Sequence, residues 1–340
     1  MSELDFDVGS FADWLNGETG RSGELAITPM KGGGSCEMFE LAEGDERFVI
    51  RRAPVAAVSD TAHNVVREFQ VIEALQGSGA RVPELLVACD DSDVLGAPFY
   101  VMRFIDGEVI RRKLPAQYVD SLETQGTIGE ELIDALVELH AFDWRGSAIE
   151  KLGNPERFLE RQVERWMHQL QGYRSRDLAG VDAVAKWLED NRPQEGELTV
   201  MHGDYKTDNA MFSKTVPPRI LSLVDFEMTT VGDPLIDLGW AMIFWPEEGN
   251  LIAIAAPGGE GGMDAAHCQS PQVLIDRYAD ATGRDLSNFQ WYQAFAAWKL
   301  GIVLEGSYAK FLSGESKNPN HEFFGFVVDQ LMERAQRFAV

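Results

Sequence analysis

Residues 202–209 read His202-Gly203-Asp204-Tyr205-Lys206-Thr207-Asp208-Asn209, and this segment is the most informative in the chain. It places a carboxylate, an ammonium group two residues later and an amide five residues after the carboxylate in one short polar stretch. Apolar, strand-like runs lie on both sides of it, at 198–201 and at 220–225. Two short strands of this kind would hold the polar segment rigidly between them.

These residue types are the ones that phosphoryl transfer needs. Asp204 is the candidate to orient an attacking hydroxyl and accept its proton, and Lys206 is the candidate to neutralise charge on a γ-phosphate. Asn209 and Asp225 offer the hard oxygen ligands that Mg²⁺ prefers. The sequence therefore predicts a phosphotransferase that uses ATP and Mg²⁺.

The same residues resemble the catalytic loop and the metal-binding aspartate of the protein-kinase-like superfamily. The form with Gly203 after His202 is similar to the aminoglycoside phosphotransferase branch. That resemblance extends to residues 232–240, Gly232-Asp233-Pro234-Leu235-Ile236-Asp237-Leu238-Gly239-Trp240, which resemble the helix that braces the catalytic loop in that branch. It implies that Asp233 and Asp237 cap and brace, and that His202 holds the loop. The chain lacks the Ala-Pro-Glu signature of protein kinases, which favours a small-molecule acceptor.

Further motifs resemble bacterial phosphotransferase-family proteins related to the kinase-like domain that is fused to certain acyl-CoA dehydrogenases. The matching motifs are residues 94–102, 139–144, 159–163, 298–300 and 304–306. They span nearly the whole chain, so the resemblance implies the complete kinase-like fold. The fused relatives imply hydroxylated acyl compounds as acceptors.

The nucleotide-binding side is expected in the first hundred residues. The turn Lys31-Gly32-Gly33-Gly34-Ser35 is expected to cover the phosphates, because glycine allows a close backbone approach. Arg51 stands where the kinase strand usually carries a lysine, and we expect it to bind phosphate. Glu68, on the following helix, is its expected ion-pair partner. Arg52 should point to the opposite face of the strand.

The resemblance also places the adenine base along Met102, Arg103 and Phe104. Contacts there are expected mostly through backbone groups, so these side chains are poor markers of the site.

The predicted fold is α+β with two lobes. Strand-like segments at 37–41, 47–51, 82–88 and 98–104 surround a helix at 61–76. After Asp106 and Gly107 the pattern changes to long helices. We therefore expect a nucleotide-binding lobe at 1–105, with a five-stranded antiparallel sheet and one principal helix, and a mainly helical lobe at 106–340 that performs catalysis and binds the acceptor.

Composition excludes several functions. The chain has 340 residues and a formal net charge of −25, which opposes binding to nucleic acid or to an anionic membrane. Three scattered cysteines fit a reducing compartment. No signal peptide and no membrane-spanning run is visible, so a soluble, cytoplasmic protein is expected.

Several residues keep two interpretations. Glu227 can be interpreted as a second metal ligand or as a hydrogen-bonded carboxylate. Asp208 is interpreted as a turn cap rather than as a metal ligand. Residues 250–270 can be interpreted as a plain loop or as a lid. The aromatic residues at 291, 292, 295 and 298 are core or acceptor pocket. The main hypothesis is a kinase of a small-molecule hydroxyl. The alternatives are a kinase of hydroxy acids or hydroxyacyl-CoA esters, and a catalytically silent nucleotide-binding or scaffold protein.

Overall fold

The structure is a computed structural model that describes residues 4–30, 36–55, 65–111, 113–119, 122–247, 263 and 266–340. The predicted phosphate turn, including Gly32, Gly33, Gly34 and Ser35, lies outside the described residues. So does most of the predicted loop at 250–270.

A five-stranded antiparallel sheet forms the N-terminal part, as predicted. Its strand order is β1, β2, β3, β5, β4. The strands are β1 (Leu25–Pro29), β2 (Glu37–Glu43), β3 (Glu46–Arg52), β4 (Leu85–Cys89) and β5 (Phe99–Arg103). Four of them confirm the predicted segments, whereas β1 was not singled out. It is an edge strand that ends in proline and is only partly buried, so its sequence carries a weak strand signal.

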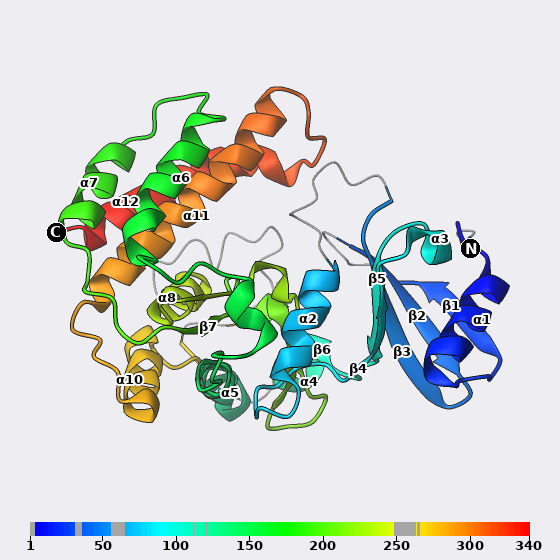
Figure 1. Ribbon diagram of the computed structural model, residues 1–340. Coiled ribbons are helices and arrows are strands. Elements are labelled where there is room, and N and C mark those ends of the chain that lie inside the picture. The colour runs from blue at the N-terminus through cyan, green and yellow to red at the C-terminus, as the bar shows by residue number, and fades with distance from the viewer. Residues whose placement is uncertain are drawn as a thin grey trace.

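Alternation along β3 sends neighbouring side chains to opposite faces of the sheet. One face packs against helix α1 (Val8–Thr19), where Phe11 and Phe48 belong to a small aromatic core. The other face carries Val49 and packs against helix α2 (Val65–Leu75). Arg52 points to the α1 side, as predicted, and forms ion pairs with Asp5 and Glu37. In Figure 1, α2 lies between the sheet and the helical part of the molecule.

The remainder is mainly helical and is organised around one buried helix. The longer helices are α5 (Leu122–His140), α6 (Gln162–Gln171), α7 (Val181–Asp190), α8 (Leu235–Phe244), α10 (Pro271–Thr282), α11 (Phe289–Leu312) and α12 (Asn320–Phe338). Helix α11 packs against α6, α7, α8 and α12, and Figure 1 shows it crossing the centre of this part. The predicted aromatic set on α11, Trp291, Tyr292, Phe295 and Trp298, is buried core.

Short strands frame residues 202–209, which we call the polar loop. The strands are β6 (Glu108–Val109), β7 (Thr199–Met201), β8 (Ala210–Phe212), β9 (Ile220–Leu223) and β10 (Thr230–Gly232). The polar loop begins directly after β7 and ends at β8, and β8 pairs with β9, which precedes Asp225. The predicted strands at 198–201 and 220–225 are thus confirmed, and the loop is fixed at both ends.

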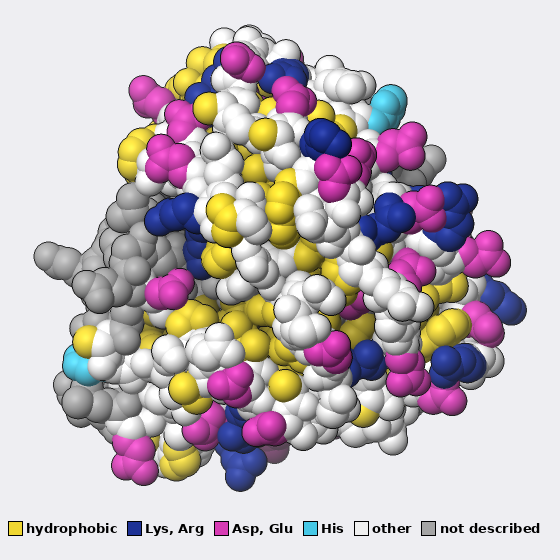
Figure 2. Space-filling model, turned by 90° about the vertical axis from the view of Figure 1, so that its left-hand side faces the viewer, with side chains coloured by type: hydrophobic (Ala, Val, Ile, Leu, Met, Phe, Trp, Pro, Cys, Tyr) yellow, Lys and Arg dark blue, Asp and Glu magenta, His cyan; other side chains and the backbone are white. Residues whose placement is uncertain are grey.

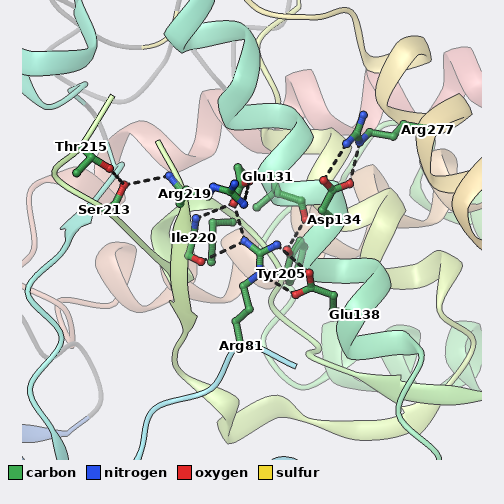
Figure 3. Close-up of polar contacts among 11 residues, drawn as sticks. Arg81, Glu131, Asp134, Glu138, Tyr205, Ser213, Thr215, Arg219, Ile220 and Arg277 are labelled. Atoms are coloured by element: carbon green, nitrogen blue, oxygen red, sulfur yellow. Dashed lines mark hydrogen bonds and ion pairs between the residues drawn. The ribbon is translucent and has the colours of Figure 1, made fainter. Parts of the chain in front are cut away.

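Arg81 fastens the segment before β4 to the helical part of the molecule. Its guanidinium contacts Glu138 at 2.7 Å and Glu131 at 2.5 Å, both on α5, and the carbonyl oxygen of Ile220 at 3.1 Å. Its own carbonyl oxygen accepts from the Leu223 amide at 2.7 Å. Figure 3 shows the guanidinium lying between these partners. One arginine therefore joins the sheet side to α5 and β9.

Acidic and basic side chains are interspersed on the face shown in Figure 2, and hydrophobic side chains gather in a band across it. On that face the acidic excess is thus not concentrated in one patch. Among the described residues, no helix combines the length and the apolar character that crossing a bilayer requires.

Candidate active site

The polar loop is held from below by Asp237 of α8. The carboxylate of this buried residue accepts hydrogen bonds from the backbone amides of His202 at 2.6 Å and Gly203 at 2.9 Å. Gly203 has a φ of +88°, and a Cβ there would lie 2.5 Å from the carbonyl oxygen of Met228. Only glycine fits this turn. Asp237 therefore braces the loop, as the sequence predicted.

Two more side chains tie the loop to its surroundings. His202 Nε2 lies 3.0 Å from the carbonyl oxygen of Val224, so the imidazole connects the loop to the end of β9. The buried Tyr205 donates its hydroxyl to the carbonyl oxygen of Leu132 on α5 at 2.5 Å. His202 has the structural position expected of it.

Asp233, at the start of α8, has the expected capping position. Its carboxylate accepts from the Leu235 amide at 3.0 Å and from the Tyr292 hydroxyl at 2.8 Å. Burial raises its pKa. It therefore anchors α8, which in turn carries Asp237.

Asp204 is held by three donors at the centre of the loop. Its Oδ2 accepts from Lys206 Nζ at 2.6 Å and from Asn209 Nδ2 at 3.0 Å, and its Oδ1 accepts from Trp240 Nε1 at 2.8 Å. Burial acts to raise the pKa of Asp204, but Lys206 and the Trp240 hydrogen bond outweigh it and leave the pKa below its ordinary value. The carboxylate is therefore ionised and fixed in orientation.

The predicted ion pair between Arg51 and Glu68 is present and buried. Arg51 Nε lies 2.8 Å from Glu68 Oε2, and Arg51 Nη2 lies 2.7 Å from Asp225 Oδ1. Glu68 Oε1 also accepts from the Phe226 amide at 3.0 Å. Burial raises the pKa of Glu68 to about 7, although the Arg51 guanidinium opposes this shift. Burial opposes the charged form of Arg51, but the Glu68 carboxylate outweighs it and raises the arginine pKa.

Asp225 adopts a left-handed backbone conformation, with φ 70° and ψ 58°. This conformation is uncommon outside glycine, although aspartate tolerates it better than most residues. Glu227, two residues later, lies on a short 3-10 turn, η4 (Phe226–Met228), and not on a strand face shared with Asp225. The interpretation of Glu227 as a second metal ligand assumed that it shares a strand face with Asp225, and that assumption is wrong.

A cavity of about 530 Å³ lies between the sheet and the short strands. The sheet side contributes Met38, Val49, Arg51, Tyr100 and Met102. The opposite side contributes Asp208, Asn209, Met211, Asp225 and Glu227. Sites for cofactors and small molecules commonly have volumes of a few hundred Å³, with mostly apolar walls and a few converging polar groups. This cavity has that character, with Arg51, Asn209 and Asp225 among its polar groups.

The expected adenine segment is only partly on the cavity wall. Met102 and Phe104 line it, but Arg103 pairs with Glu84 at 3.1 Å on the exposed side of β5. The amides of Arg103 and Phe104 are already bonded to the carbonyl oxygens of Glu84 and Arg47. Both amides are thus used within the fold, and contacts of the adenine through the other backbone groups of this segment stay a prediction. Ile105, the next residue, lines the cavity and was missed.

Asn209 and Asp225 fit a magnesium site. Both line the cavity, Asn209 uses only its amide nitrogen on Asp204, and Arg51 contacts one carboxylate oxygen of Asp225. Among the described residues, no partner uses the remaining oxygen of either side chain, so each can be offered to an ion. Mg²⁺ is usually held by one or two carboxylates together with substrate phosphates. A site of this kind needs few protein ligands. In the part of the chain that the structure describes, no cluster of three His, Cys, Asp or Glu residues that could hold a metal ion occurs.

Trp240 was quoted in the sequence motif but not recognised as a partner of Asp204. It lies three residues after Asp237, so both side chains project from the same side of α8. That spacing is the signal that would have found it.

Comparison with known proteins places the chain among phosphotransferases. A family model described as the phosphotransferase enzyme family matches residues 26–284. Acyl-CoA dehydrogenase family member 11 of Gallus gallus is 30% identical over 322 residues, which are 92% of this chain and 40% of that protein. The chain therefore spans about two fifths of the length of this relative.

Solved structures give the same result. The crystal structure of a putative aminoglycoside phosphotransferase from Ralstonia eutropha JMP134 is 27% identical, covers 98% of both chains and has a TM-score of 0.83. A spectinomycin phosphotransferase solved with ADP and spectinomycin covers 98% of this chain and 100% of its own, at 10% identity and a TM-score of 0.62. The latter likeness shows the fold alone. Both resemblances drawn from the sequence motifs, to aminoglycoside phosphotransferases and to the acyl-CoA dehydrogenase relatives, are confirmed.

Proposed function

This chain belongs to the phosphotransferase enzyme family, and on that premise we propose that it transfers the γ-phosphoryl group of ATP to a hydroxyl of a small molecule. One observation carries the proposal. Asp204 is ionised and fixed by three donors, and one of these, Asn209, also lies on the wall of a cavity that Arg51 and Asp225 border. A hydroxyl-orienting carboxylate thus lies beside a cavity of suitable size for a nucleotide.

The proposed reaction is an in-line displacement. The acceptor hydroxyl oxygen forms a bond to the γ-phosphorus, the bond from that phosphorus to the bridging oxygen breaks, and ADP leaves. Asp204 orients the hydroxyl and takes its proton, while Lys206 neutralises charge on the transferred group. Because the Asp204 carboxylate is only a weak base, its main contribution is orientation, as is usual for phosphoryl transfer.

The nucleotide is proposed to lie in the 530 Å³ cavity, with its base near Met102 and Ile105. Arg51 would contact the phosphates, held in place by Glu68. Asn209 and Asp225 would hold Mg²⁺, which when bound neutralises phosphate charge. The solved spectinomycin phosphotransferase contains ADP, which supports a nucleotide as the donor.

A second candidate function differs in its acceptor. The relative that is 30% identical is an acyl-CoA dehydrogenase family protein. This supports hydroxy acids or hydroxyacyl-CoA esters as acceptors, whereas the solved relatives support aminoglycosides or similar alcohols.

The test is acceptor-dependent ADP release by the purified chain with Mg²⁺ and ATP. The acceptor panel contains aminoglycosides, amino alcohols, sugars, hydroxy acids and hydroxyacyl-CoA esters. Asp204→Asn should reduce turnover by at least about 100-fold, because the amide neither holds the acceptor hydroxyl as the carboxylate does nor takes its proton. The matched control is Asp177→Asn, where the side chain is 96% exposed, and its turnover should equal that of the parent.

Direct nucleotide binding separates the remaining outcomes. ATP binding without turnover by any acceptor would favour the catalytically silent alternative. Absence of ATP binding with Mg²⁺ present would contradict both that alternative and the proposed kinase.

A further inference from the structure

Lys299 of α11 is a buried cation that forms no direct ion pair with any described residue. The residue is 8% exposed, and no hydrogen bond or ion pair reaches its ammonium group from any residue that the structure describes. Its Nζ lies 4.3 Å from the centroid of the Trp240 ring and 5.1 Å from that of Trp166. Aromatic faces attract a cation but accept no ordinary hydrogen bond from it. A buried ammonium group in such a site is unfavourable unless something else satisfies it.

The position of Lys299 is close to the proposed chemistry. The Trp240 indole that faces its Nζ donates its own N–H to Asp204 Oδ1 at 2.8 Å. Burial lowers the pKa of Lys299 to about 8, and the carboxylates of Asp237 and Asp204 act against that shift. At neutral pH the ammonium is therefore mostly charged.

Two further cationic side chains, Arg165 and Lys206, lie near Lys299. Arg165 and Lys206 both act to lower the pKa of Lys299, so their charges are close to it. Lys206 is paired with Asp204, but Arg165 only stacks on Trp166, 5.6 Å from the ring centroid, and within the described ranges it contacts no carboxylate. Positive charge thus collects beside Asp204 in a chain with a formal charge of −25.

We infer that Lys299 binds an anionic group, a carboxylate or a phosphate, on the acceptor whose hydroxyl Asp204 orients. This inference rests on the proposed phosphotransferase function and specifies its acceptor. Trp166 and Trp240 would flank the acceptor with apolar surface, and the anion would supply the hydrogen-bond acceptor that Lys299 lacks. A cationic acceptor such as an amino sugar would be repelled by the same ammonium. Lys299 is therefore a specificity-determining residue.

The experiment is calorimetric titration of the full chain in the presence of Mg²⁺ and ADP. The probes are short- and medium-chain hydroxycarboxylates, their neutral hydroxyamides, glycerol 3-phosphate and an amino sugar. A hydroxycarboxylate or the phosphate ester should bind at least about 10-fold more tightly than the neutral amides. Lys299→Met should abolish that preference, and Lys299→Arg should keep part of it. The matched control is Lys310→Met, the same change at an exposed position of α11, and it should behave like the parent.

Each other result would overturn the inference. Equal affinities for hydroxycarboxylates and amides, tight binding of the amino sugar alone, or no binding of any anionic probe would exclude an anion subsite. If the Lys299→Met variant still binds anionic probes more tightly than neutral amides and unfolds at the same temperature as the parent, the anion subsite lies elsewhere. Tighter binding of the hydroxycarboxylates indicates a carboxylate subsite, and tighter binding of glycerol 3-phosphate indicates a phosphate subsite. ADP binding, measured in the same cell, tests the nucleotide part of the proposed function independently.

Discussion

Arg51 Nη2 lies 2.7 Å from Asp225 Oδ1 while Nε of the same guanidinium lies 2.8 Å from Glu68 Oε2. One side chain of β3 thus connects α2 with the segment that follows β9. A lysine at this position would present a single ammonium group and not a planar fork with separate donors for the two carboxylates. The arginine therefore makes a different contact from the lysine usual in the superfamily, and it fixes Asp225 as well as Glu68.

Removing the Arg51 charge should destabilise the fold strongly. Arg51→Met leaves Glu68 buried without its partner, and breaking a buried pair in this way typically costs about 3–5 kcal/mol. Denaturant unfolding measures the change. The double variant Arg51→Met with Glu68→Gln should recover part of the loss. The control is Arg47→Met. Arg47 lies on β3, like Arg51, but its ion pair with Glu40 of β2 is exposed, so stability should change little. A stable Arg51→Met single variant would contradict the importance of the pair.

Glu68 should make stability depend on pH. Its pKa is raised to about 7 in the folded protein from an ordinary value of 4.5. Between these values the folded state holds more protons than the unfolded state, so the free energy of unfolding falls as pH rises from about 4.5 to 7. The contribution is on the order of 1–3 kcal/mol. Glu68→Gln should remove this slope, whereas Glu73→Gln, exposed on the same helix, should retain it. Parallel curves for the parent and Glu68→Gln would refute the assignment.

The sequence was informative where the determinants are local. Asp204, Lys206 and Asn209 lie within six residues of each other between two short strands, so their convergence follows from spacing. Arg51 and Glu68 lie on a strand and the next helix, a relation that the family resemblance supplies. The adenine contact expected at Arg103 involves its backbone and stays a prediction, since alternation along β5 turns only its side chain away from that of Met102. Contacts between distant segments, such as that of Arg81 with α5 and β9, leave no mark in any local pattern.

Asp237 should be among the most sensitive positions outside the cavity. Asp237→Asn turns one of its two acceptor oxygens into a donor that faces the amide of His202 or Gly203. The resulting unpaired, buried donors should cost about 2–4 kcal/mol of stability and lower turnover, because the polar loop loses its support. Thermal unfolding and ADP release measure the two effects. Asp280→Asn, at an exposed position of α10, is the control. Unchanged turnover in Asp237→Asn would show that the brace is dispensable.

Arg81 should stabilise the junction shown in Figure 3. Arg81→Ala removes contacts with Glu131, Glu138 and the Ile220 carbonyl oxygen, and a loss of about 1–3 kcal/mol is expected for this partly buried network. A double-mutant cycle with Glu131→Ala should give a coupling energy of at least about 0.5 kcal/mol, because the two residues share a network. Strict additivity of the two single variants would argue against coupling.

Trp240 should affect the rate more than binding. Trp240→Phe keeps an aromatic ring against Lys299 but removes the N–H that fixes Asp204 Oδ1. Asp204 would keep Lys206 and Asn209, so the carboxylate would stay ionised but turn more freely. Because orientation is its main contribution, kcat should fall about 10-fold, with the KM for ATP nearly unchanged. Trp187→Phe, half-buried on α7, controls for the loss of an indole. A higher KM for ATP with unchanged kcat would instead assign Trp240 to nucleotide binding and remove it from the orientation of Asp204.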